Sequence, residues 1–74
     1  MKFTAIYEEA TEGGYVAYVA ELPGANSQGE TLDEARENLK DAVEMLLDCY
    51  RQDAEKHLAD SPAARKEDLI LQAA

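Results

Sequence analysis

The chain has 74 residues, which is enough for one small hydrophobic core and too few for a second domain. Hydrophobic residues make up 46% of it, too many for a wholly disordered protein. No apolar run approaches the roughly 20 residues of a membrane-spanning helix. We therefore expect a single folded domain over residues 1–74, with no membrane association.

The composition is strongly acidic, with 16 Asp and Glu against 7 Lys and Arg and a formal net charge of −9. Such a surface repels nucleic-acid phosphates and anionic lipids and favours a basic protein partner. The charge could equally serve only to keep a small protein in solution. Because the basic residues are scattered and form no stripe, direct nucleic-acid binding is not expected.

Alternating side chains predict two strands joined by a hairpin. Residues 2–9 place Phe3, Ala5 and Tyr7 on one face of a first strand. Residues 10–14 supply polar side chains and two glycines, which are typical of a hairpin turn. Residues 15–22 return as a second strand with two largely apolar faces. This pattern predicts a central strand that is covered on both faces.

A break and a helix start follow the second strand. Pro23 and Gly24 predict a turn, because proline lacks an amide hydrogen and glycine accepts unusual backbone angles. Residues 25–28 are expected to form a short third strand. Thr31 and Glu34 then have the spacing of a capping box, in which each side chain bonds the other residue's amide. A helix is therefore expected to begin here.

The expected helix carries one apolar stripe, which we predict to face the sheet. Its members recur at three- and four-residue spacing: Leu32, Ala35, Leu39, Ala42, Val43, Leu46, Leu47, Tyr50 and Ala54. Pro62 ends the helix, because it pushes Ser61 out of the helical region. Beyond it the sequence fits either a short second helix from Ser61 or an irregular link and a fourth strand over residues 68–72. We favour the strand.

The residue types needed for catalysis or metal binding are sparse. Cys49 and His57 are the only soft metal ligands, and their spacing places them on different helical faces. Cys49 is expected to be a small core residue. The acids match no calcium loop or HExxH helix, and the glycines match no nucleotide-binding loop. We therefore expect no catalytic residue, no cofactor and no metal, and core packing accounts for the five aromatic residues: Phe3, Tyr7, Tyr15, Tyr18 and Tyr50.

A domain this small usually needs a disulfide, a metal or another subunit for stability. One cysteine excludes an internal disulfide, so self-association into a dimer or tetramer is expected. The first four residues show no secretory signal, and a cytoplasmic location is expected.

Three segments together resemble the N-terminal domain of HicB antitoxins. They are GGYVAYVAELPGA at residues 13–25, SQGETLDEA at residues 27–35 and NLKDA at residues 38–42. The resemblance spans roughly residues 2–48. It implies an α+β fold of β-β-β-α-β order, with a three- to four-stranded, mainly antiparallel sheet packed on one long helix. In the family this fold is described as a partial ribonuclease H-like arrangement. The implied order of strands and helix agrees with the elements predicted above.

The resemblance also implies a partner, a small basic HicA-like toxin. Such toxins resemble double-stranded-RNA-binding domains, cleave mRNA with a histidine and are silenced when HicB covers them. Many HicB-like proteins carry a C-terminal DNA-binding region, for which a chain ending at Ala74 has no room. Promoter binding by this chain is therefore not expected.

Three functions are compatible with these observations. The first is a non-enzymatic antitoxin of a type II toxin-antitoxin system that occludes a HicA-like toxin. The second is a solitary HicB-like oligomer that acts in regulation or as a scaffold without a toxin. The third is a residual nuclease with carboxylate-bound Mg²⁺, which would need inward-facing acids on strands one, two and four. We favour the first.

Partner contacts are expected from exposed acids near the sheet and its loops. The Leu22-Pro23-Gly24 turn and the helix cap already have structural roles. The candidate partner-binding residues, which would pair with basic residues of a toxin, are Glu8, Glu9, Glu12, Glu21 and Glu30.

Overall fold

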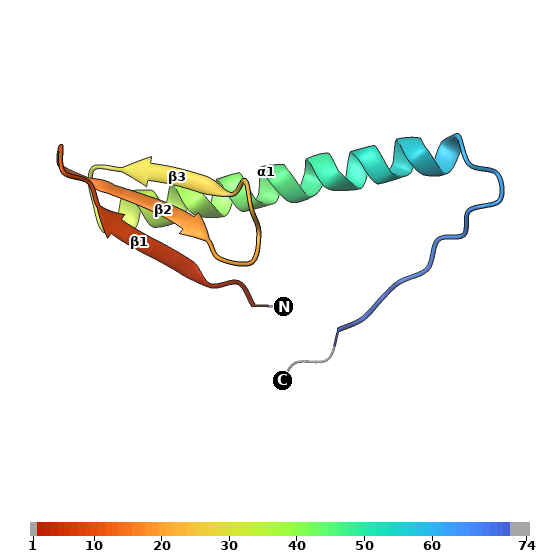
Figure 1. The fold of residues 1–74 in the computed structure, drawn as a ribbon, viewed down its shortest axis with the longest axis horizontal. Helices are drawn as coiled ribbons and strands as arrows, with labels where there is room; N and C mark the ends of the chain where they lie inside the picture. The colour runs from red at the N-terminus through yellow and green to blue at the C-terminus, as the bar shows by residue number, and fades with distance from the viewer. Residues whose placement is uncertain (1, 72–74) are drawn as a thin grey trace.

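A computed structural model describes residues 2–71 and shows three strands followed by one long helix. The elements are β1 (Ala5–Glu9), β2 (Tyr15–Val19), β3 (Asn26–Gly29) and α1 (Leu32–Ala59). The strands form one antiparallel sheet in the order β1-β2-β3, and α1 packs against one face of it (Figure 1). This is the α+β arrangement that the sequence predicted.

The sheet has one covered face and one open face. Alternation along β2 turns Tyr15, Ala17 and Val19 toward α1, and it turns Val16 and Tyr18 away from it. Val16 and Tyr18 are 38% and 37% exposed. The prediction that this strand is covered on both faces was wrong, because the single helix can cover only one face of the sheet.

The helix begins and ends where the local sequence predicted. The Thr31 hydroxyl accepts a hydrogen bond from the Glu34 amide at 3.1 Å, which is one half of the expected capping box. Acidic side chains occupy the first turn and basic ones the last, so that both ends complement the helix dipole. The last helical residue is Ala59, followed by Asp60 as the C-cap and then by Pro62.

The core is small and lies where α1 crosses the sheet. Its buried members come from the second strand, the turn before β3 and the first half of the helix: Ala17, Val19, Ala25, Ala35 and Leu39. The 28 residues of α1 span about 42 Å, whereas a five-residue strand spans about 17 Å. Val43 and Leu46 still pack against the core, but Tyr50, Ala54 and Cys49 are exposed.

Three predictions were wrong, the first two because α1 extends beyond the sheet. The stripe does not face the sheet along its whole length, and Cys49 is not a core residue. Core packing explains only part of the aromatic set, since Tyr7 and Tyr15 pack on the core while Phe3, Tyr18 and Tyr50 are exposed.

The segment after α1 forms one turn and then runs back in the direction of the sheet while it moves away from the helix (Figure 1). The Ala64 amide donates to the Ser61 carbonyl at 2.9 Å, and Lys66 Nζ lies 2.6 Å from Glu55 Oε1. Neither the second helix nor the fourth strand forms within residues 61–71, and Gln72 lies outside the described residues. The ion pair joins the start of this segment to the second half of α1.

Candidate partner-binding surface

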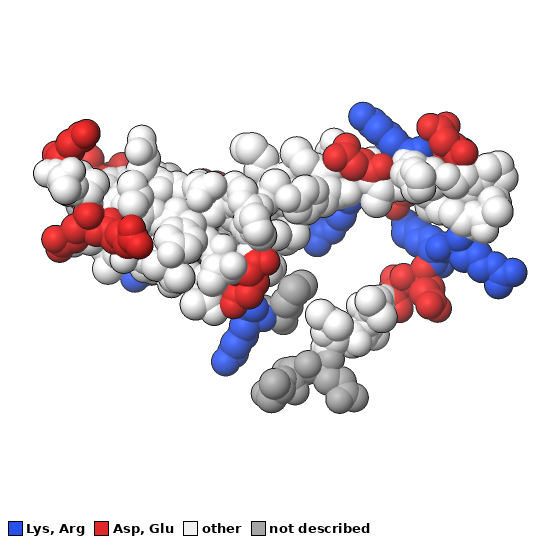
Figure 2. All heavy atoms as spheres, in the orientation of Figure 1, with Lys and Arg blue, Asp and Glu red and all other residues white. Residues whose placement is uncertain are grey.

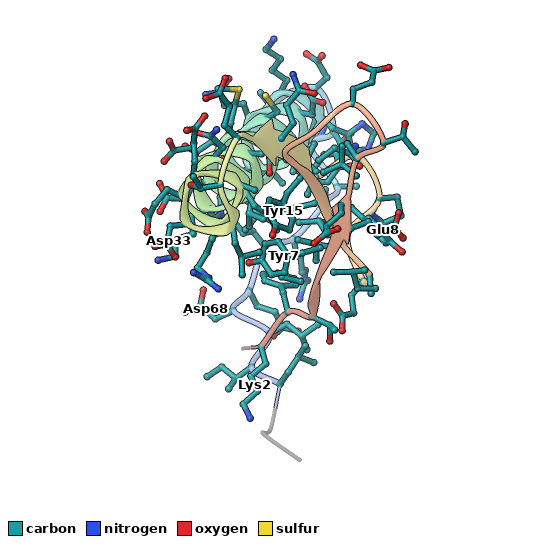
Figure 3. All side chains as sticks on the ribbon, turned by 90° about the vertical axis from the view of Figure 1, so that its left-hand side faces the viewer. Lys2, Tyr7, Glu8, Tyr15, Asp33 and Asp68 are labelled. Carbon is teal, nitrogen blue, oxygen red and sulfur yellow. The ribbon has the colours of Figure 1, made fainter. Side chains whose placement is uncertain are left out.

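The open side of the sheet forms a surface that we call the outer sheet face, made of Ile6 and Glu8 from β1 and Val16 and Tyr18 from β2. The register places Ile6 opposite Tyr18 and Glu8 opposite Val16. Figure 3 shows Tyr7 and Tyr15 between the sheet and α1 and Glu8 on the other side of the sheet. Apolar and aromatic side chains with charged neighbours are typical of the centre and rim of a protein interface.

Most of the predicted glutamates lie toward the hairpin end of the sheet. Glu12 and Glu30 border one surface hollow there, together with Glu34. Glu9 ends β1 opposite Tyr15, and Glu8 precedes it on the other face. Figure 2 shows acidic atoms gathered at this end of the molecule, while basic and acidic atoms lie side by side around the far end of α1. The structure therefore brings four of the five candidates to one end.

These glutamates are not neutralised within the described residues. The four ion pairs of residues 2–71 use other acids, namely Asp33, Glu37, Asp48 and Glu55. Three of the pairs join residues three apart on α1 and neutralise Arg36, Lys40 and Arg51 locally. The negative charge at the hairpin end is thus available to a cationic partner.

Glu21 differs from the other candidates, because it is bonded to the start of the chain. Thr4 donates to its carboxylate twice, from the hydroxyl to Oε2 at 2.6 Å and from the amide to Oε1 at 2.7 Å. The hydroxyl bond foremost, and then the amide bond, hold the pKa of Glu21 below its usual value. Glu21 therefore joins the chain before β1 to the turn after β2, at the opposite end of the sheet from the hairpin.

Replacing Thr4 by valine is expected to raise the pKa of Glu21 toward its usual value, because the hydroxyl donor is lost while the amide remains. A carboxyl group whose pKa is lowered in the folded state stabilises the fold at pH values above its unfolded-state pKa. This contribution disappears as the pH falls through the folded-state pKa. NMR titration of the glutamate carboxyl carbons measures the shift. Unchanged titration of Glu21 in the Thr4→Val variant would show that the hydroxyl bond is absent in solution.

Residues 2–71 contain no group of three or more His, Cys, Asp and Glu side chains arranged to hold a metal ion. The acids that a metal-dependent nuclease would need on one face of three strands are not brought together in this range. No helix within it is long and apolar enough to cross a membrane.

Val16 and Tyr18 were expected to be covered and are exposed instead. One signal for their exposure was present, since a chain with a single helix can cover only one face of a sheet.

Comparison with known proteins identifies the family of the chain. The family model described as UPF0150-like matches residues 3–52, which include all three strands and the sheet-packing half of α1. The chain belongs to this family. A UPF0150 protein of Synechocystis sp. is 41% identical over 59 residues, which cover 80% of this chain and 82% of the relative. A UPF0150 protein of Archaeoglobus fulgidus is 42% identical over 48 residues, or 65% and 70% of the two chains.

Antitoxin HicB of Escherichia coli K12 is 39% identical over 62 residues, which are 84% of this chain. The same 62 residues cover only 45% of the antitoxin's length, so this chain matches just under half of that protein. No solved structure gives a significant match. The predicted resemblance to HicB is confirmed, and the family includes antitoxins.

Proposed function

We propose that the chain is an antitoxin that binds a small basic HicA-like toxin and covers the surface with which the toxin cleaves mRNA. The observation that carries this proposal is the outer sheet face, where Val16 and Tyr18 lie uncovered beside Glu8. The relationship to Antitoxin HicB supports the class of partner. Inhibition by occlusion requires no reaction and no cofactor.

The two kinds of side chain have separate roles in this proposal. Val16 and Tyr18 are removed from water at the centre of the contact, where apolar burial stabilises a complex by about 25 cal/mol per Å². Glu8, Glu12 and Glu30 attract a cationic partner and orient it, which raises the association rate and the specificity. Because Glu21 is already bonded to Thr4, its replacement would disturb the fold as well as the contact.

The test is charge reversal that leaves Glu21 in place. We expect Glu8→Lys/Glu12→Lys/Glu30→Lys to weaken binding of a small basic HicA-like protein by at least about tenfold, because three attractive charges become repulsive. The loss should shrink at high salt, which screens exposed charges. Isothermal titration calorimetry at two salt concentrations measures both effects.

The matched control is Asp41→Lys/Asp53→Lys/Glu67→Lys, which changes the net charge equally at exposed sites on α1 and after it. It should retain most of the affinity. A second variant, Tyr18→Ala, removes an exposed aromatic side chain without touching charge and should also weaken binding. Equal affinities for the triple glutamate variant and the control variant would exclude the three glutamates as the contact, and an unchanged affinity of Tyr18→Ala would exclude the outer sheet face. Failure of the unmodified chain to bind the toxin would favour the solitary regulatory or scaffold role.

A further inference from the structure

The edge strand β3 turns part of its backbone away from the rest of the sheet. The Val19 amide donates to the Ala25 carbonyl at 3.2 Å, so these two residues form a bonded pair just before β3 begins. In an antiparallel pair only alternate residues bond the neighbouring strand. The register therefore directs the backbone of Ser27 toward β2. Asn26 and Gln28, on either side of it, direct their amides and carbonyls outward.

A side chain of α1 reaches this edge and shows the same orientation. Asn38 Nδ2 donates to the Gln28 carbonyl at 2.8 Å, so that carbonyl points away from β2. The Asn26 amide, the Asn26 carbonyl and the Gln28 amide have no partner among residues 2–71. Unpaired backbone groups at the edge of a sheet are a template for another strand.

The side chains of β3 continue the outer sheet face up to this edge. The register places Gln28 beside Val16 and Asn26 beside Tyr18, and both carboxamides are exposed. A strand added to β3 would carry alternate side chains onto the same face, next to these two carboxamides. A partner that covers Val16 and Tyr18 is therefore in reach of the free backbone groups.

A hollow lies where β3 meets the hairpin and the start of α1. It has a volume of about 940 Å³, and its lining includes Gln28, Asn38, Glu30 and Glu34. Neither of these glutamates forms an ion pair within residues 2–71, and the hollow is lined by no lysine or arginine. The end of a strand paired with β3 would therefore meet uncompensated negative charge.

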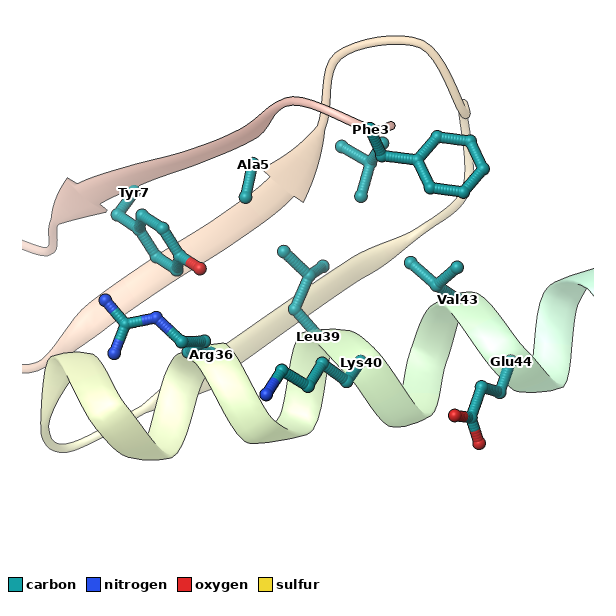
Figure 4. A pocket seen from close by; sticks show the side chains of 9 residues that line it. Phe3, Ala5, Tyr7, Arg36, Leu39, Lys40, Val43 and Glu44 are labelled. Atoms are coloured by element: carbon teal, nitrogen blue, oxygen red, sulfur yellow. The ribbon is translucent and has the colours of Figure 1, made fainter. Parts of the chain in front are cut away.

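The opposite edge of the sheet, at β1, has different neighbours. An apolar groove of about 390 Å³ runs there between β1 and α1 (Figure 4). Its charged lining consists of Arg36, Lys40 and Glu44, and the Arg36 guanidinium lies 5.6 Å from the centre of the Tyr7 ring. A cationic segment would meet two cations at β1, whereas the hollow beside β3 presents only carboxylates.

We propose, on the basis of the proposed function, that the basic partner adds an extended segment to β3 and bonds the outward backbone groups of Asn26 and Gln28. Main-chain bonds of this kind hold the partner, and the side-chain positions select it. Side chains on one face of the segment lie next to Tyr18 and Val16. Those on the other face point toward α1 and the hollow, so lysine or arginine is expected at alternate positions of the segment.

Amide hydrogen exchange of the full chain, measured by NMR with and without a small basic HicA-like protein, tests this pairing. In the free chain the amides of Asn26 and Gln28 should exchange rapidly, and the amide of Ser27, which faces β2, should exchange slowly. On binding, the exchange of Asn26 and Gln28 should slow by at least about a hundredfold, because strand pairing protects amides from solvent. The Tyr7 amide, which faces outward at β1, should keep its rate.

A proline at the same edge gives a second test. Asn26→Pro removes an outward amide at the first residue of an edge strand, where proline is tolerated, and should weaken binding by at least about tenfold. The matched control is Ala5→Pro, at the first residue of β1. The Thr4 carbonyl accepts from Ala20, so the Ala5 amide also faces outward, and its loss should not change the affinity. Circular dichroism checks that both variants are folded.

The outcomes separate the strand pairing from the proposed function. If the HicA-like protein binds and the amides of Asn26 and Gln28 stay unprotected, the pairing is wrong, while the outer sheet face remains the contact. Equal affinities of the two proline variants, or protection of Tyr7 in place of Asn26 and Gln28, would also overturn the pairing. If the unmodified chain binds no HicA-like protein, the proposed function itself is contradicted.

Discussion

Replacement of Gly29 by alanine is expected to lower the free energy of unfolding by about 3 kcal/mol, at the upper end of the usual cost of overpacking. A Cβ atom on Gly29 would lie 2.5 Å from the Ala35 amide nitrogen and 2.9 Å from the Glu34 carbonyl carbon. Both are backbone atoms of the first helical turn, so no side-chain rotation relieves the clash. Because a domain of this size has a total stability of about 5 kcal/mol, most of it would be lost.

Urea unfolding followed by circular dichroism measures this loss, at one fixed protein concentration for all variants. Gly13→Ala is the matched control. Gly13 has a φ of +98°, but nothing lies within 4 Å of its Cβ position, so alanine there costs only the strain of a left-handed backbone, about 1 kcal/mol. Losses of equal size at the two positions would mean that β3 and α1 are not in close backbone contact.

Replacement of Leu39 by alanine is expected to cost about 3 kcal/mol, the usual effect of emptying a buried leucine site. Leu39 is 4% exposed and is the largest of the buried core residues. The other buried members are three alanines and one valine, which cannot fill the space that the leucine leaves. The same variant widens the groove along β1, which Leu39 lines.

The control for this variant is Met45→Ala, on the same helix but 68% exposed. It should change the stability by less than about 0.5 kcal/mol, because it removes little buried surface. Thermal unfolding by calorimetry, again at matched concentrations, compares the two. A small effect at Leu39 together with a large one at Met45 would show that the helix presents a different face to the sheet.

The sequence was sufficient for features that depend on neighbouring residues. Residues 10–14 form a turn because their glycines adopt positive φ angles, and Thr31 begins α1 because its hydroxyl reaches an amide three residues on. Pro62 ends the helix because of a clash with the residue before it. The three-strand order and the resemblance to HicB follow from the same local patterns.

The candidate site was predicted only in part. Exposed acids could be named from composition, and four of the five lie toward one end of the sheet. Glu21 was placed in the same set, but its carboxylate bonds Thr4, which is 17 residues away. Val16 and Tyr18 were placed in the core because β-strand periodicity reveals which residues share a face, and not which face the helix covers.

The sequence by itself determined the order of the elements, their caps and turns, the acidic charge and the family. Only the tertiary structure decided which face of the sheet is open, how far α1 extends beyond the strands and where Leu69 to Leu71 lie. The physical reason is distance along the chain. Turns and caps are made by residues a few positions apart. Which part of the sheet the helix covers depends instead on the lengths of separate elements and on contacts between residues far apart in the sequence.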